Sequence, residues 1–204
     1  KFVQFLSALI PGLALLKWVD KRPLAALGMG FDGDAFKKLC LGMAMGFLLI
    51  SSGAFLLRLT GAASFSFNGL SFDLVLYLLC GLLVLVVSAC YEELLFRGYV
   101  FQALVEGTGL WITLGAFALL FGAAHISNAG ATVFSVAVSA LAGIFLGIMY
   151  FKTRTLWMCI GAHFMWNWTM GALFGIGIKD SKFARRSLFT YIPSDSGFIL
   201  GADA

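Results

Sequence analysis

Six apolar stretches follow one another along the chain, separated by short polar or glycine-containing breaks. They lie at about 2–16, 39–58, 71–90, 109–126, 131–150 and 155–178. One crossing of the hydrocarbon core of a bilayer needs about 20 apolar residues. The pattern therefore predicts an all-α, polytopic transmembrane bundle with about six membrane-inserted helices.

The connection 17–38 differs from the others because it mixes apolar residues with five Lys or Arg residues. Such a mixture indicates an amphipathic segment at the membrane surface, and its positive charge favours the cytoplasmic side. The connections 60–71 and 125–131 contain no Lys or Arg, so we expect them on the opposite side. Lys152 and Arg154 return the chain to the cytoplasmic side. The basic tail after the last stretch would then lie on the outer side, whereas basic segments are usually cytoplasmic. This conflict leaves open that one inserted helix does not cross the membrane fully.

The composition excludes a water-soluble enzyme. Of the 204 residues, 61% are hydrophobic and 12% are charged, and the mean hydropathy is +0.96, whereas soluble domains carry about 25% charged residues. The net charge of +4 comes from dispersed residues, and without a basic stripe a nucleic-acid partner is not expected. We expect one integral membrane domain over residues 1–204, with truncated ends and a further span beyond them. Compact loops and the lack of a transit-type leader favour a prokaryotic plasma membrane.

A small set of polar side chains interrupts the apolar stretches. They are Glu92, Glu93, Arg97, His125, His163 and Asn167. Both histidines of the chain belong to this set. Because ionisable groups at membrane depth are costly and by default mark function, these six residues form the candidate site.

Helical geometry predicts that Glu92 and His125 meet. About 16 residues, or about 24 Å, separate each of them from the turn near 107–109. An antiparallel helical hairpin would therefore bring both residues to the same depth. His163 and Asn167 are four residues apart and share one helix face. Counted in the same way, His163 lies about 8 Å deeper than His125, an offset that helix tilt can absorb.

Glu93 and Arg97 are also four residues apart, a spacing at which a carboxylate and a guanidinium pair. Taken alone, this pair could equally be a structural ion pair, and each histidine could be an interhelical hydrogen-bond donor. The convergence of six polar residues favours a functional site over these structural interpretations.

These residue types suit hydrolysis. A desolvated carboxylate has a raised pKa and can take a proton from water as a general base. Histidines and an amide can orient that water or donate to the oxyanion of a tetrahedral intermediate. Alternatively, Glu92, His125 and His163 could hold a catalytic zinc ion with an open position for water. Spacing alone leaves both mechanisms open.

The ordered motifs resemble those of a known family of membrane proteins. Glu92-Glu93-x-x-x-Arg97, Phe121-x-x-x-His125 and His163-x-x-x-Asn167 are similar in order and separation to the signature of the CAAX prenyl endopeptidase and bacteriocin-processing family, also called Abi or CPBP. Each motif alone is weak, whereas the ordered set of three is specific. The motifs cover about residues 90 to 170.

This resemblance implies an intramembrane endopeptidase that cleaves a peptide or protein substrate, prenylated or not, among membrane lipids. It implies that Glu92 activates the water with help from His125, and that Glu93 and Arg97 support the site. His163 and Asn167 would stabilise the oxyanion. The family has been described both as metalloendopeptidases and as metal-free glutamate-dependent proteases. We favour Glu92 as a metal-independent base, with zinc held by Glu92 and the two histidines as the rival.

The sequence is also compatible with two other functions. A non-catalytic membrane immunity or peptide-binding protein could use the same polar cluster for docking. A proton-coupled transporter could use Glu92, Glu93 and His125 as a relay, although the chain lacks inverted repeats. Other intramembrane proteases do not fit, because the sequence contains no H-E-x-x-H, Gly-x-Gly-Asp or Gly-x-Ser-Gly motif.

Overall fold

The computed structural model describes residues 10–31, 33–128, 130–176 and 187–194. Its helices are α2 (Ala35–Leu59), α3 (Phe72–Arg97), α4 (Tyr99–Thr108), α5 (Leu110–Ala124), α6 (Val133–Thr153) and α7 (Leu156–Trp168). Short helical turns are η1 (Leu15–Val19), η2 (Leu24–Leu27) and η3 (Thr169–Leu173). The basic tail, the C-terminal residues that suggested a further span and the start of the first apolar stretch lie outside the described residues.

The predicted bundle of membrane helices is confirmed, because each of the six apolar stretches overlaps a described helix. Within the described residues, three stretches are long and apolar enough to cross a membrane: Ala35–Leu59, Phe72–Thr108 and Val133–Thr153. Ile10–Val19 and Leu110–Ala124 are shorter apolar helices. The second of these has 15 residues, which gives a length of about 22 Å against the roughly 30 Å of a hydrocarbon core. By its length, α5 is too short to cross the core alone.

Hydroxyl side chains fix where several helices begin. Ser71 Oγ accepts a hydrogen bond from Leu74 N–H at the start of α3, and Thr155 Oγ1 accepts one from Trp157 N–H at the start of α7. Thr132 forms a reciprocal capping box at the start of α6. Such caps satisfy backbone donors that the first helical turn leaves without partners.

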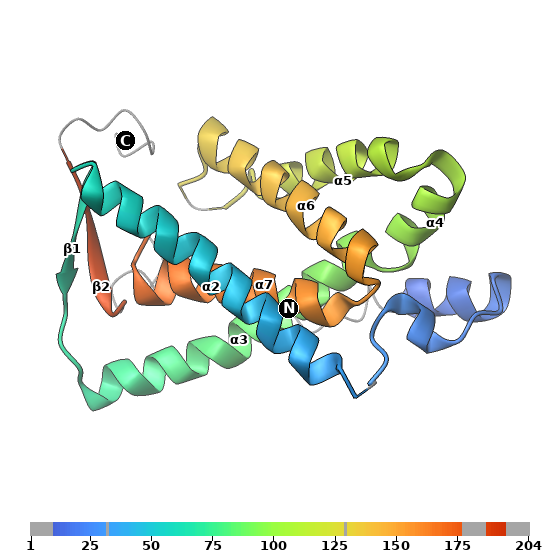
Figure 1. The fold of residues 1–204 in the computed structure, drawn as a ribbon, viewed down its shortest axis with the longest axis horizontal. Coiled ribbons are helices and arrows are strands. Elements are labelled where there is room, and N and C mark those ends of the chain that lie inside the picture. The colour runs from blue at the N-terminus through green and yellow to red at the C-terminus, as the bar shows by residue number, and fades with distance from the viewer. Residues whose placement is uncertain (1–9, 32, 129, 177–186, 195–204) are drawn as a thin grey trace.

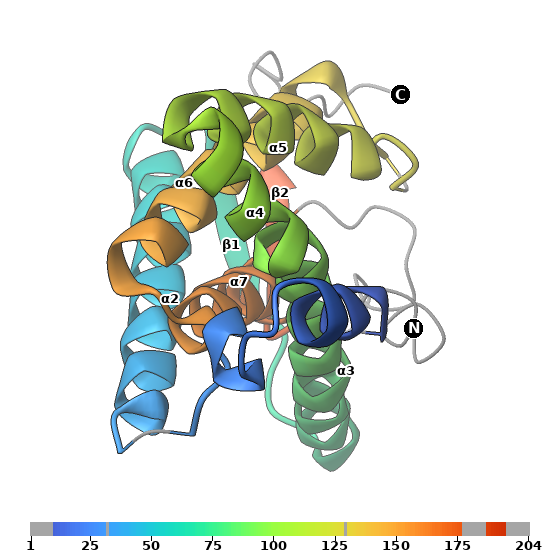
Figure 2. The ribbon, with the colours of Figure 1, turned by 90° about the vertical axis from the view of Figure 1, so that its right-hand side faces the viewer.

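Helix α7 lies at the centre of the bundle. It packs against α2, α3 and α6, and Figure 2 shows it between α2 and α3. In Figure 1, α5 and α6 lie together above this group, and α4 leads from α3 to α5. Because α7 contacts three other long helices, side chains on several of its faces point into the protein rather than toward lipid.

Glycines allow α2 and α7 to pack with their backbones in close contact. A Cβ atom at Gly42 would lie 2.1 Å from Met158 O, and one at Gly46 would lie 2.2 Å from Ala162 O. Both partners advance by four residues, so the two helices run in the same direction. The spacing Gly42-x-x-x-Gly46 is the small-residue pattern that lets membrane helices approach closely.

The helix expected to run from Glu92 to the turn near 107–109 is interrupted, so this part of the prediction is wrong. Helix α3 ends at Arg97, and α4 starts after Gly98. A Cβ atom at Gly98 would lie 2.1 Å from Leu94 O, which shows why glycine occupies the bend. The predicted turn itself is present, because Gly109 separates α4 from α5 with a φ of +87°.

A two-stranded antiparallel sheet was not predicted. Strand β1 (Ala63–Phe67) pairs with β2 (Phe189–Pro193), and Phe67 lies opposite Phe189. Their ring centroids are 5.6 Å apart, and the sheet lies at one end of the bundle (Figure 1). The sheet joins the connection between α2 and α3 to a segment more than a hundred residues later. The local pattern of apolar and polar residues does not predict such a distant pairing.

The connection between η1 and α2 packs against the turn between α6 and α7. The carbonyl oxygen of Gly28 accepts hydrogen bonds from Leu156 N–H at 2.8 Å and from Thr155 Oγ1 at 3.3 Å. Two basic connections, 17–38 and the α6–α7 turn, therefore lie at the same end of the bundle, which agrees with their assignment to one side.

Substituting Gly46 by Ala should lower the stability of the bundle. The added methyl group would force the α2 and α7 backbones apart, and overpacking of this kind costs about 1–3 kcal/mol. Gly53→Ala on the same helix is the matched control, because a Cβ atom there meets nothing within 4 Å. Thermal unfolding in detergent measures the difference. Equal midpoints for the two variants would contradict the close approach of α2 and α7.

Candidate active site

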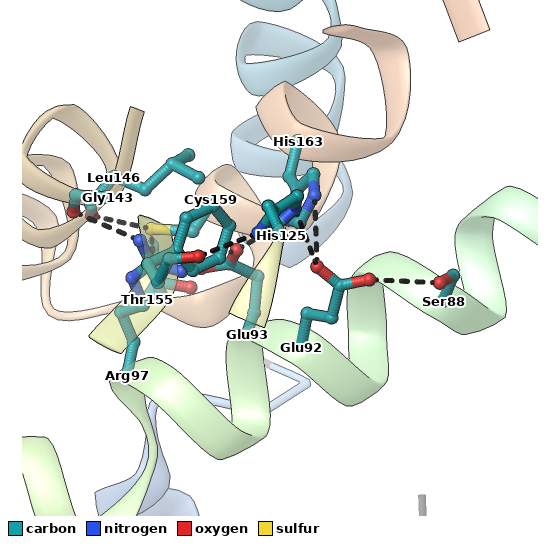
Figure 3. A network of polar contacts seen from close by, with 11 residues as sticks. Ser88, Glu92, Glu93, Arg97, His125, Gly143, Leu146, Thr155, Cys159 and His163 are labelled. Carbon is teal, nitrogen blue, oxygen red and sulfur yellow. Dashed lines mark hydrogen bonds and ion pairs between the residues drawn. The ribbon is translucent and has the colours of Figure 1, made fainter. Parts of the chain in front are cut away.

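The structure brings five of the six predicted site residues into one polar network. Glu92, Glu93 and Arg97 lie on the last turns of α3, His125 caps the C-terminal end of α5, and His163 lies on α7. Figure 3 shows these side chains converging between the three helices. The predicted meeting of Glu92 with His125 is confirmed, although the helix between them bends at Gly98.

Glu93 forms the buried centre of the network. Its side chain is fully buried, and Oε1 accepts hydrogen bonds from Arg97 Nη1 at 3.0 Å and from His163 Nδ1 at 2.7 Å. Within the described residues, Oε2 of Glu93 has no hydrogen-bond partner. A single carboxylate oxygen thus fixes both the guanidinium on its own helix and the imidazole on α7.

Arg97 extends the network to α5 and α6. Its Nη2 donates to the carbonyl oxygen of Gly143 on α6 at 3.0 Å, and its Cζ lies 4.6 Å from the centroid of the Phe121 ring on α5. A guanidinium over an aromatic face is attracted by the ring quadrupole. Arg97 therefore compensates the buried charge of Glu93 and holds three helices together.

Glu92 is the carboxylate that faces both histidines. Its Oε2 lies 3.6 Å from His163 Nε2 and 4.0 Å from His125 Nε2. The exposed fraction is 17% for the Glu92 side chain and 24% for that of His125, against 0% for Glu93. Of the two neighbouring glutamates, only Glu92 is therefore accessible to a reactant.

The hydrogen bonds of the two histidines determine which ring nitrogen faces Glu92. His125 Nδ1–H donates to the carbonyl oxygen of Phe121 at 2.7 Å, and His163 Nδ1–H donates to Glu93. A carbonyl oxygen can only accept, so His125 carries its proton on Nδ1. Both Nε2 atoms are left to point at the same oxygen of Glu92.

Asn167 is the predicted site residue that the network does not include. It lies on α7 one turn after His163, on the same helix face. Its side chain is half-buried, and among the described residues no hydrogen bond involves it. The structure therefore places Asn167 beside the network without giving it a partner there.

The side chains around Glu92 match a metal site in residue type but not in arrangement. Glu92, His125 and His163 are residue types that bind zinc, and their Nδ1 contacts are of the kind that orient ligating histidines. In the described part of the chain, however, no group of three or more His, Cys, Asp or Glu side chains is arranged to hold a metal ion. As arranged in the structure, these described side chains do not fit a metal ion.

Ser88 belongs to the network but was missed by the sequence analysis. Its Oγ donates to Glu92 Oε1 at 3.1 Å, and the residue is buried on α3. The signal was the spacing Ser88-x-x-x-Glu92, which puts the two residues on the same helix face. Serine is common in membrane helices, so this spacing alone carries little information.

Replacing Arg97 by Met should destabilise the protein strongly, because it leaves the buried Glu93 charge without its cationic partner. Removing one partner of a buried ion pair costs about 3–5 kcal/mol. The matched control is Arg22→Met, which breaks the exposed pair between Arg22 and Glu106 at 2.7 Å and should have little effect. Chemical unfolding in detergent compares the two variants. Equal losses of stability would contradict the central role of the Glu93–Arg97 pair.

One comparison with known proteins gives a match, and it covers the site. Residues 74–169 match the family model described as type II CAAX prenyl endopeptidase Rce1-like. The matched segment contains the whole polar network and ends just after Asn167. No curated protein and no solved structure matches the chain. Over residues 74–169, this chain is therefore similar to the Rce1-like family of CAAX-type intramembrane proteases, and its long apolar helices indicate an integral membrane protein.

Proposed function

We propose that the protein is an intramembrane endopeptidase in which Glu92 activates the water that hydrolyses a peptide bond. One observation carries the proposal: Nε2 of His125 and Nε2 of His163 face the same accessible oxygen of Glu92. A carboxylate and two oriented imidazoles around one point are suited to holding and deprotonating a water molecule.

The separations between these atoms fit a bridging water. The 3.6 Å and 4.0 Å distances from Glu92 Oε2 to the two Nε2 atoms exceed those of direct hydrogen bonds. Polar groups at such distances are commonly joined by a water molecule. A water there donates one hydrogen to Glu92 and the other to His125 Nε2, which leaves an oxygen lone pair free to attack.

Hydrolysis then proceeds in two steps. Glu92 Oε2 takes one proton from the water, and the water oxygen adds to the carbonyl carbon of the scissile bond. The π electron pair moves onto the carbonyl oxygen, which becomes the oxyanion of a tetrahedral intermediate. As the intermediate collapses, the C–N bond breaks and Glu92 returns the proton to the leaving amine. One water is consumed, and the Glu92 carboxylate is regenerated.

The remaining residues orient the reaction. Arg97 compensates Glu93, and Glu93 holds His163 through Nδ1. An imidazolium donates from both ring nitrogens, so His163 in that form holds Glu93 through Nδ1 and the oxyanion through Nε2. Asn167, one turn later on the same face, supplies the second oxyanion donor. His125 assists Glu92 in positioning the water.

The proposed substrate is a peptide or a membrane-associated protein, prenylated or not, and the proposed setting is a prokaryotic plasma membrane. The family description, which names a CAAX prenyl endopeptidase, supports a test with prenylated peptides. Apolar surfaces on α2, α3 and α6 support a site that substrates reach from within the membrane.

Glu92→Gln should reduce the cleavage rate by about 10²–10⁴-fold, because an amide cannot act as the general base. The assay uses purified protein and fluorogenic peptides with and without a farnesylated CAAX end. Glu106→Gln is the matched control: it is the same substitution at an exposed glutamate paired with Arg22, far from the network. It should leave cleavage unchanged.

Two other results would change the assignment. Cleavage of all peptides by Glu92→Gln at the wild-type rate would overturn the role of Glu92. An absence of cleavage by folded wild-type protein would instead favour a non-catalytic immunity or peptide-binding protein. One zinc ion per chain, measured in the same samples, would instead support Glu92, His125 and His163 as metal ligands.

A further inference from the structure

Ser88 contacts the proposed base from the side opposite the histidines. It lies one turn before Glu92 on α3, it is 8% exposed, and its Oγ donates to Glu92 Oε1 at 3.1 Å. Figure 3 shows Ser88 and the two histidines on opposite sides of the Glu92 carboxylate. The two oxygens of Glu92 thus have different partners.

The direction of this hydrogen bond sets Ser88 apart from other hydroxyl residues in these helices. Ser and Thr side chains within helices usually donate back to a carbonyl oxygen three or four residues earlier. Several do so here, including Ser52 to Leu49 O, Thr113 to Gly109 O, Ser139 to Ser135 O and Thr153 to Met149 O. Among the described residues, the hydrogen bond of Ser88 goes forward to Glu92 instead. Its hydroxyl proton is therefore donated to the carboxylate and not to a backbone carbonyl oxygen.

This contact restricts the terminal torsion of the Glu92 side chain. The terminal torsion of a glutamate side chain is broad, so its carboxylate plane is not fixed by rotamer preference. A hydrogen bond to Oε1 fixes the plane and leaves Oε2 directed at His125 and His163. Without that bond, the carboxylate can rotate and the water-binding geometry is lost for part of the time.

We propose that Ser88 is a positioning residue, whose hydroxyl holds the Glu92 carboxylate so that Oε2 faces the two histidines. The proposal rests on the proposed function, because it assigns Ser88 the task of orienting the base. It adds a residue that acts through Glu92 and does not touch the substrate. A purely structural serine would stabilise α3 but would leave the orientation of Glu92 unchanged.

Removal of the hydroxyl should therefore lower kcat and leave substrate binding intact. Ser88→Ala is expected to reduce kcat about tenfold, with KM within about twofold of the wild type, on a fluorogenic farnesylated CAAX peptide. Ser88→Thr keeps a hydroxyl and should restore kcat to within about threefold of the wild type. Ser52→Ala on α2 is the matched control, since its hydroxyl donates to the backbone carbonyl oxygen of Leu49, and it should cleave normally.

Parallel measurement of Glu92→Gln separates the failure of this proposal from the failure of the proposed function. If Glu92→Gln is inactive and Ser88→Ala cleaves at the wild-type rate, the protease assignment stands and the role of Ser88 is overturned. Equal losses in Ser88→Ala and Ser88→Thr would also overturn it, because the hydroxyl would not be the cause. Full activity of Glu92→Gln would overturn both.

A spectroscopic readout tests the contact without any substrate. The chain has three glutamates, Glu92, Glu93 and Glu106, so labelling with ¹³C-carboxyl glutamate gives few infrared carboxylate bands. The Glu92 band is the one that Glu92→Gln removes. We expect Ser88→Ala to shift this band and Ser88→Thr to leave it near its wild-type position. An unshifted band in Ser88→Ala would show that the hydroxyl does not hold the carboxylate and would overturn the proposal.

Discussion

The buried carboxylate of Glu93 is the charge on which the arrangement of the site depends. A carboxylate without water must be compensated by a cation and by hydrogen-bond donors. Arg97 and His163 both donate to the same oxygen of Glu93, and Arg97 also binds Gly143 O. The need to compensate one charge therefore ties α3 to α6 and α7. It also fixes the ring of His163, which turns Nε2 toward Glu92.

Close helix packing supplies the second constraint. Helix α7 carries His163 and lies against α2 with no room for a side chain at Gly42 or Gly46. Between helices in lipid, the hydrophobic effect provides no driving force, so stability comes from van der Waals contact and polar interactions. The glycine contact holds α7 from one side, while Glu93 holds it through His163 from another. A catalytic geometry with distances of a few ångströms requires this rigidity in the elements that carry it.

The two neighbouring glutamates have identical side chains but different roles, because they differ in burial. Glu93 is fully buried and accepts from two donors, whereas Glu92 is partly exposed and faces two imidazole nitrogens that have no direct hydrogen-bond partner among the described residues. The bend at Gly98 ends α3 directly after Arg97. It turns α4 and α5 back so that His125 reaches Glu92. The network lies where α3, α5 and α7 meet.

The sequence by itself determined the membrane-helical class, the approximate positions of most helices and five of the polar residues that meet in the network. Apolar length and the cost of charge in lipid act locally, so both can be read from the order of residues. The tertiary structure alone decided the bend at Gly98, the β1–β2 pairing, the contact of Gly42 and Gly46 with α7, and the hydrogen bond from Ser88. Each of these depends on which backbone or side chain comes within contact distance from a remote part of the chain or in a particular rotamer. Helical spacing shows which residues share a face, but only packing decides which face is buried and which oxygen of a carboxylate remains free.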